Sequence, residues 1–242
     1  MTGPSVDLSI VIPIYNEEDN IEPLMAEIAQ AVGPLGRSYE VICVDDKSSD
    51  STPEVLRRLK KTYPQLRIVR HTRNCGESAG QATGFHFARG AVVITMDGDG
   101  QNDPADIPRL LEALADGVDC VCGVRRKRED DWVKRFSSRT ANRFRNFLTG
   151  DTIADAGCTY RAIRRAALRE MLVFNGMHRF LPSILRFQGR TVVEIQVNHR
   201  PRRAGVSKYG IGNRLWRGIR DCLAMRWYKR RALPLDRFGE AE

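Results

Sequence analysis

Residues 8–19 read LSIVIPIYNEED, and this stretch decides the fold class. Its first seven residues, Leu8–Ile14, form a continuous apolar run of the kind found in a parallel strand that is buried on both faces. Tyr15 and Asn16 end the run, and the acidic side chains that follow suit the first turn of a helix with Asn16 as its N-cap. The stretch therefore predicts a β-strand followed directly by an α-helix.

The same alternation continues through the first half of the chain. Four further apolar runs, each followed by polar residues, predict strands at 39–44, 67–70, 91–96 and 119–124. After these, strands are expected at 157–161 and 191–197, and a last helix at about 213–231. Strands alternating with helices predict an α/β fold with a mostly parallel sheet flanked by helices.

Charge divides the chain into two unlike halves. The formal net charge of +9 combines −8 up to Val124 with +17 from Arg125 onward, and 32 of the 39 basic residues are Arg. Arg suits bidentate capture of phosphate, so phosphorylated ligands, nucleic acid and anionic lipid are all candidate partners. Because no linker separates the halves, we expect residues 1–124 and 125–242 to form one domain with a basic C-terminal elaboration.

Several protein classes are not favoured by the sequence. It has no apolar run of the roughly 18–20 residues that span a bilayer, and its first residues do not resemble a signal peptide. The six cysteines form no C-x-x-C pair, and Cys43 and Cys120 lie in apolar runs. We therefore expect reduced core cysteines and a cytoplasmic protein.

Polar side chains follow three of the predicted strands, at 15–17, 45–46 and 97–99. In an open parallel sheet, ligands bind beyond the carboxyl ends of the strands, so these clusters are expected to meet there. Asp97 and Asp99 are separated by one residue, and their oxygens suit a hard cation such as Mg²⁺ or Mn²⁺ that could neutralise a diphosphate.

Residues 76–80 spell G-x-S-x-G, the nucleophile elbow of serine hydrolases, with Ser78 as the nucleophile. An elbow needs its Ser at a sharp turn directly after a strand, whereas five residues, 71–75, follow the predicted strand here. Gly76, Gly80 and Gly84 recur every four positions, which favours one helix face packed closely against the sheet. The hydrolase stays a distant alternative.

The basic second half permits two readings besides a soluble surface. Direct nucleic-acid binding is not favoured, because no recognised nucleic-acid motif is present and the first half is acidic. The helix at 213–231 combines Arg with an apolar stripe of Leu215, Trp216, Ile219, Cys222 and Leu223. Such a helix either packs on the domain or lies on an anionic membrane surface.

Four motifs occur in this order along the chain: Pro13-x-Tyr15-Asn16-Glu17, Val44-Asp45-Asp46-x-Ser48-x-Asp50, Arg73-Asn74-x-Gly76 and Asp97-x-Asp99-x-Gln101. Together they resemble glycosyltransferase family 2, which has the GT-A fold. Two later motifs, Asp155-x-Gly157-Cys158-x-Tyr160-Arg161 and Arg202-x-x-Gly205-x-Ser207-Lys208-Tyr209, are similar to the dolichyl- and polyprenyl-phosphate sugar synthases, typified by dolichol-phosphate mannose synthase. Many relatives carry Glu where this chain has Val206.

The resemblance implies a role for each matching residue. For the nucleoside pocket it implies Pro13, Tyr15, Glu17, Val44 and Asp46, with Asp46 facing the base or ribose. For the metal and diphosphate it implies Asp97, Gly98, Asp99 and Gln101, with Asp97, Asp99 and Gln101 as metal ligands. For the donor phosphates or the acceptor it implies Arg125, Arg202 and Lys208, and for the lipid phosphate Arg139. Asp99, Arg125 and Arg139 are the implied catalytic residues.

The resemblance also implies an activity. It is metal-dependent, inverting transfer of a hexosyl group from a nucleotide sugar (GDP-mannose or a UDP-sugar) to a polyprenyl phosphate. Residues 1–124 would bind the donor, and residues 125–242 would face the acceptor and the membrane. The enzyme would be peripheral on the cytosolic membrane face, alone or with a membrane-protein partner. The alternative within the family is elongation of a polysaccharide or lipopolysaccharide.

Overall fold

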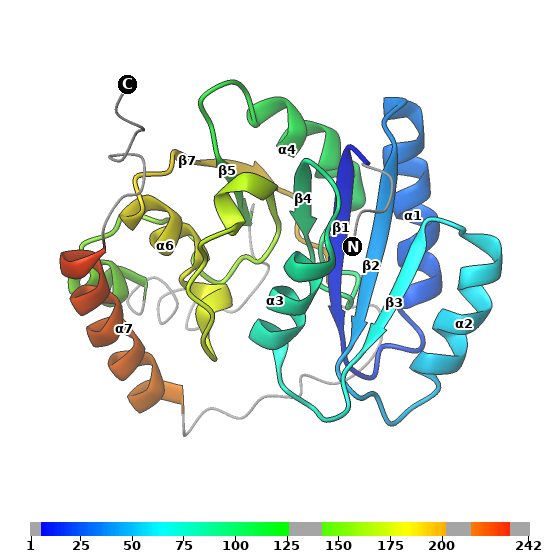
Figure 1. Ribbon diagram of the computed structural model, residues 1–242, viewed down its shortest axis with the longest axis horizontal. Coiled ribbons are helices and arrows are strands. Elements are labelled where there is room, and N and C mark those ends of the chain that lie inside the picture. The colour runs from blue at the N-terminus through cyan, green and yellow to red at the C-terminus, as the bar shows by residue number, and fades with distance from the viewer. Residues whose placement is uncertain (1–5, 126–141, 202–213, 233–242) are drawn as a thin grey trace, which may run out of the picture.

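The computed structural model describes residues 6–125, 142–201 and 214–232 (Figure 1). Within these residues one seven-stranded sheet has the order β3-β2-β1-β4-β6-β5-β7. Neighbouring strands are parallel except that β6 runs antiparallel to both β4 and β5. The strands are β1 Leu8–Ile14, β2 Tyr39–Asp45, β3 Leu66–Arg70, β4 Val92–Thr95, β5 Cys120–Arg125, β6 Arg161–Arg164 and β7 Val192–Val197. The α/β class with a mostly parallel sheet is confirmed.

Helices cover both faces of the sheet (Figure 1). The core beneath α1, α2 and α4 is formed by the alternate β1 residues Leu8, Ile10, Ile12 and Ile14, and α3 covers the opposite face at Val11. The α-helices are α1 Ile21–Val32, α2 Thr52–Thr62, α3 Glu77–Phe87, α4 Ile107–Ala113, a helix at 142–149, α6 Leu181–Phe187 and α7 Arg214–Arg231. The 3₁₀ turns are η1 Gly33–Leu35, η2 Pro104–Asp106, η3 Arg165–Leu168 and η4 Met177–Arg179.

Two local predictions are wrong. The first helix begins at Ile21, and Asn16 is not its cap but takes a left-handed conformation (φ 54°) in the loop before it. The side chain of Asn16 accepts the N–H of Ser49 (2.8 Å), so it joins two loops instead of starting a helix. The strand expected at 157–161 begins only at its last residue, Arg161, because the preceding residues form a turn that leads into β6.

Small residues bring α3 very close to β1, as the glycine spacing predicts. A Cβ at Gly84 would lie 2.1 Å from Cγ1 of Val11, and one at Gly80 would lie 2.8 Å from Cβ of Pro13. Gly76 has another role, because its φ of 85° serves the turn that precedes the helix. The close approach places the first turn of α3 beside the carboxyl end of β1.

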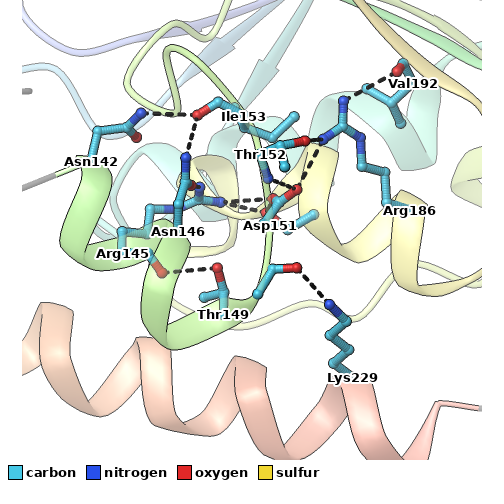
Figure 2. Close-up of polar contacts among 12 residues, drawn as sticks. Asn142, Arg145, Asn146, Thr149, Asp151, Thr152, Ile153, Arg186, Val192 and Lys229 are labelled. Carbon is cyan, nitrogen blue, oxygen red and sulfur yellow. Dashed lines mark hydrogen bonds and ion pairs between the residues drawn. The ribbon is translucent and has the colours of Figure 1, made fainter.

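The second half of the chain is held together by a buried ionic network (Figure 2). Asp151 pairs with Arg186 (2.9 Å) and Arg145 (3.5 Å), and it accepts a hydrogen bond from Ser183. Burial raises the pKa of Asp151, but the Ser183 hydrogen bond, the Thr152 N–H and the charge of Arg145 outweigh it and hold that pKa below its ordinary value. The network fixes the helix at 142–149 against α6.

Helix α7 has the predicted bounds, but the predicted apolar stripe divides. Of the stripe residues, Cys222 is buried and packs with Met225 on the domain, Leu223 is 52% exposed, and the side chains of Leu215 and Trp216 lie outside the described part of the structure. Trp227, one turn beyond the stripe, is 64% exposed. Lys229 donates to the carbonyl of Gly150 (2.5 Å), which fastens α7 to the end of the helix at 142–149 (Figure 2). Among the described residues, no helix combines the length and the apolar character needed to cross a membrane.

Candidate functional site

A cavity of about 240 Å³ opens at the carboxyl ends of β1, β2 and β4. Because these strands are parallel neighbours, the loops that follow them meet at one edge of the sheet. The loop between β3 and α3 completes the wall. The lining residues are Pro13, Ile14, Tyr15, Glu17, Asp46, Asn74, Gly76, Glu77, Asp97, Gly98 and Asp99.

The cavity brings together most of the residues that the sequence singled out. Seven of them line it: Pro13, Tyr15, Glu17, Asp46, Asp97, Gly98 and Asp99. Three others do not: Val44 is fully buried in the core beneath α3, and Gln101 and Arg125 lie outside the lining. Arg139, Arg202 and Lys208 lie outside the described residues.

Asp97 and Asp99 place two carboxylates on one tight turn. The turn is held by Asn102, which accepts the Asp97 N–H (2.8 Å), and by Thr159, whose hydroxyl donates to Oδ1 of Asp97 (2.7 Å). Burial, and after it the charge of Asp99, raises the pKa of Asp97 to about 6. A pair of carboxylates that repel each other in this way is suited to share a divalent cation.

Asp46 organises the loop opposite this turn. Its carboxylate accepts the N–H groups of Cys75 (2.8 Å) and Gly76 (2.7 Å), and Oδ1 contacts Nδ1 of His71 (2.7 Å). The other ring nitrogen of His71 contacts Thr83 (2.9 Å). Asp46, His71 and Cys75 bring their donor atoms within 4.8 Å of one another, but these hydrogen bonds already use the carboxylate and both ring nitrogens. Asp46 therefore shapes the cavity wall at residues 74–77.

The loops after β1 and β2 are joined by side-chain hydrogen bonds. Ser48 accepts the N–H of Asn16 (2.9 Å), and Thr52 accepts the N–H of Glu17 (2.9 Å). These bonds hold Tyr15 and Glu17 on the cavity wall without a regular element. Buried polar backbone groups that are satisfied in this way give a loop one defined geometry.

The chain that leads toward residue 202 is anchored next to the carboxylate turn. Arg200 donates its N–H to the carbonyl of Gln101 (2.9 Å), and its guanidinium bonds both Glu27 (2.7 Å) and Asp103. Nε2 of Gln101 donates to the Arg200 carbonyl (3.3 Å), so the amide oxygen is the atom that Gln101 would offer to a cation. Arg200 is thus a point of the chain that is fixed beside Gln101.

Arg125 ends β5 and is paired instead of free. Its Nε and Nη2 each lie 2.7 Å from the carboxylate of Asp155, a bidentate geometry. A Cβ at Gly157 would lie 2.9 Å from Nη2 of Arg125, so only glycine fits there without displacing the guanidinium. The motif Asp155-x-Gly157 therefore orients Arg125. Burial and the charge of Asp99 raise the pKa of Asp97, and the charge of Arg125 acts in the opposite direction without outweighing them.

Ser78 does not occupy a nucleophile elbow. It is the second residue of α3, and six residues separate that helix from β3. Ser78 is also buried, with only 4% of its surface exposed. Its Oγ accepts the N–H of Gly176 (2.9 Å) and contacts Nδ1 of His178 (2.7 Å). The exposed, strained turn that a serine hydrolase requires is not present at this position.

Sequence reasoning did not assign a role to four of the lining residues: Ile14, Asn74, Gly76 and Glu77. Asn74 and Gly76 belong to a motif that the sequence displays, so a signal for them existed. Glu77 carried none, because an acidic residue in the first turn of a helix is ordinary. Burial, and after it the charge of Asp97, raises the pKa of Glu77, with Arg161 and Arg179 acting in the opposite direction.

Comparison with known proteins finds relatives along most of the chain. It is 38% identical over 206 residues to an undecaprenyl-phosphate 4-deoxy-4-formamido-L-arabinose transferase of Edwardsiella ictaluri, which covers 84% of this chain and 63% of the relative. It is 36% identical over 241 residues to a dodecaprenyl-phosphate galacturonate synthase of Rhizobium johnstonii, covering 97% of this chain and 71% of the relative. The chain thus spans less than two thirds of the length of the arabinose transferases that it matches.

Solved structures share the fold at low sequence identity. A mannosyltransferase of Pyrobaculum calidifontis, in complex with GDP-Man and Mn²⁺, gives a TM-score of 0.64 at 22% identity, covering 99% of this chain and 66% of that one. A glucosyl-3-phosphoglycerate synthase of Mycobacterium tuberculosis, in complex with Mn²⁺, UDP and phosphoglyceric acid, gives a TM-score of 0.67 at 18% identity, covering 93% of this chain and 78% of that one. These similarities support the GT-A-like fold that the resemblance implied.

The family itself follows from the sequence match and agrees with the geometry of the cavity. The model of glycosyl transferase family 2 matches residues 9–172, which include every residue of the cavity wall. The chain belongs to glycosyltransferase family 2.

Proposed function

We propose that this chain transfers a sugar from a nucleotide sugar to a polyprenyl phosphate, with metal dependence and inversion at the anomeric carbon. One observation carries the proposal: carboxylates that follow three adjacent strands line a single cavity, with Glu17 after β1, Asp46 after β2, and Asp97 and Asp99 after β4. Relatives whose names specify prenyl-phosphate sugar transfer support the acceptor. Residues 1–124 would bind the donor, and residues 125–242 would face the acceptor.

The donor set fits Mg²⁺ or Mn²⁺. Asp97 and Asp99 would hold the cation, with Gln101 as a third ligand through its amide oxygen, and the raised pKa of Asp97 indicates the electrostatic strain that a cation would relieve. When bound, the cation supplies Lewis-acid stabilisation to the departing nucleoside diphosphate. Structural relatives contain Mn²⁺ in their complexes, which supports this assignment.

The chain's own residues would supply positioning and charge. Pro13, Tyr15 and Glu17 with Asp46 would hold the nucleoside, and Val44, which lies in the core and not in the cavity lining, would support this wall from behind. Arg125 would be presented to phosphate by Asp155, and Arg139, Arg202 and Lys208 would add charge. The acceptor is already anionic at pH 7, so positioning can replace much of the work of a general base.

The donor sugar is proposed only as a class. The sequence pointed to a hexosyl group from GDP-mannose or a UDP-sugar, whereas the names of the relatives specify a formamido-arabinose and a galacturonate. We therefore propose a nucleotide-linked hexose or arabinose derivative. A panel of nucleotide sugars in a thermal-shift assay with Mn²⁺ would identify the donor, because a ligand that binds only the folded state raises the melting temperature.

The basic second half would bring the enzyme to the cytosolic surface of an anionic membrane. Helix α7 presents Leu223 and Trp227 to solvent beside several arginines, and the helix at 142–149 exposes 49% of Phe144 and 77% of Phe147. Exposed aromatic residues next to basic ones suit the interface of an anionic bilayer. Vesicle sedimentation tests this, and Trp227→Ser should reduce binding to anionic vesicles without changing donor affinity.

The transfer itself is tested with purified protein, Mn²⁺, a labelled nucleotide sugar and undecaprenyl phosphate. The expected product is a labelled lipid that releases its sugar in mild acid. Asp99→Ala and EDTA should each abolish it, whereas the exposed Asp116→Ala serves as a matched control. Full activity of Asp99→Ala in EDTA would show that the metal assignment is wrong. Label that appears only in a saccharide stable to mild acid would favour polysaccharide or lipopolysaccharide elongation.

A further inference from the structure

Glu77 is a cavity residue for which the proposed transfer has no use. It is the first residue of α3, its side chain is 28% exposed, and it lines the same cavity as Asp97 and Asp99. Burial of an acidic side chain carries a free-energy cost, so its place on this wall calls for a physical reason.

The protein holds this carboxyl group only loosely. Oε2 lies 3.5 Å from Nε2 of His178, and Oε1 lies 3.4 Å from Nε2 of Gln81. A carboxylate can accept about four hydrogen bonds, and contacts of this length are weak ones. Much of the accepting capacity of Glu77 is therefore left for a group inside the cavity.

The contact with His178 has a defined direction. Oγ of Ser78 accepts the N–H of Gly176, so its own proton can be donated to Nδ1 of His178, which lies 2.7 Å away. With Nδ1 accepting, a neutral imidazole carries its proton on Nε2, the nitrogen that faces Glu77. The Ser78 and His178 side chains thus orient Glu77 from behind, and the two ring nitrogens are exchanged relative to a hydrolytic triad, because Nδ1 faces the serine and Nε2 faces the carboxylate.

The neighbourhood of Glu77 indicates what it contacts. Glu77 lines the same cavity as the proposed metal ligands Asp97 and Asp99, and the charges of both act on it. In the proposed function this part of the cavity holds the diphosphate, and the transferred sugar is bonded directly to it. An ionised diphosphate offers no hydrogen-bond donor to a carboxyl oxygen, whereas the hydroxyl groups of the sugar bonded to it do.

We propose that Glu77 binds a hydroxyl group of the transferred sugar and that His178, backed by Ser78, is its positioning residue. The inference rests on the proposed function for the identity of the ligand as a nucleotide sugar. It adds a sugar-binding residue on α3 to a site otherwise built from the loops after β1, β2, β3 and β4.

The test separates the sugar from the nucleotide. Calorimetry with Mn²⁺ compares UDP-glucose and UDP-glucuronate with UDP, and GDP-mannose with GDP, and the donor bound most tightly by the wild type is the probe. Glu77→Gln keeps the size of the side chain but replaces one of its two acceptor oxygens with an NH₂ donor, and we expect about 5- to 10-fold weaker binding of that donor sugar nucleotide. Affinity for the nucleoside diphosphate should stay within about twofold. The exposed Glu54→Gln on α2 is the matched control.

Equal weakening of donor and nucleoside diphosphate, or no weakening of either, would overturn the assignment. If Glu77→Gln does not fold, the pair His178→Gln and His178→Asn carries the test. The Gln amide can reach the position of Nε2 and should largely preserve donor affinity, whereas Asn reaches only that of Nδ1 and should weaken it. Equal donor affinities in this pair would refute the positioning role.

These results are distinguishable from failure of the proposed function. Donor binding that depends on Glu77, without transfer to undecaprenyl phosphate, would reject the acceptor and leave this inference standing. If the protein transfers sugar to undecaprenyl phosphate and Glu77→Gln leaves the KM for the donor unchanged, the proposed function stands and only this inference is rejected.

Discussion

The substitution Asp46→Asn tests whether one buried carboxylate shapes the donor cavity. The wild-type carboxylate is 4% exposed and accepts from Cys75, Gly76 and His71 at 2.7–2.8 Å. Asparagine offers one acceptor oxygen, so its amide NH₂ must face at least one of these donors. Because one charge-assisted hydrogen bond is lost and the other two are weakened, we expect the free energy of unfolding to fall by about 3–5 kcal/mol.

For a chain of this size that loss corresponds to a fall in melting temperature of roughly 6–20 °C. Part of the cost can be taken by local opening of residues 71–76, which would reduce donor affinity before global unfolding. The assay is therefore a thermal melt together with nucleotide binding in Mn²⁺. Asp19→Asn, which removes the same charge from an exposed position in the β1–α1 loop, is the control. A variant at position 46 that melts within about 2 °C of wild type and binds nucleotide normally would refute the reasoning.

Three further predictions follow from packing, exposure and charge. Gly84→Ala should lower the free energy of unfolding by about 1–3 kcal/mol or more, because its Cβ would lie 2.1 Å from Cγ1 of Val11. Gly218→Ala, in open space on α7, should raise the free energy of unfolding by about 0.5–1 kcal/mol. Chemical denaturation compares the two variants, and equal effects would contradict the packing argument. Of the six cysteines only Cys75 is exposed, and its chain neighbours Asn74 and Gly76 line the cavity, so a small maleimide should label Cys75 alone and bound nucleotide should slow the labelling. Peptide mass mapping checks this, and a labelling rate unaffected by nucleotide would argue that the nucleotide does not bind beside residues 74–76. Because the pKa of Asp151 is lowered in the folded protein, its contribution to stability is full above about pH 4, the pKa of an Asp in the unfolded chain, and is lost as the pH falls further. Asp151→Asn should therefore reduce the dependence of the unfolding free energy on pH below about pH 4, and an unchanged dependence would contradict this.

The family match required only local patterns and their order. Strand β1 is found where the apolar run predicts it, and the motif carboxylates follow the ends of β1, β2 and β4. The prediction that these ends share one edge is confirmed, because right-handed crossovers leave parallel strands little alternative. The expectation of core cysteines at Cys43 and Cys120 is confirmed, because both are buried.

By itself, the sequence determined the α/β class, the strands of the first half and the carboxylates at their ends, because alternation and apolar runs are properties of neighbouring residues. Only the tertiary structure decided that β6 runs antiparallel between β4 and β5, which brings Asp155 to Arg125. It also decided that His178 stands behind Glu77, 101 positions earlier in the chain. Such contacts depend on how helices pack across the sheet, and no local period encodes a partner that distant.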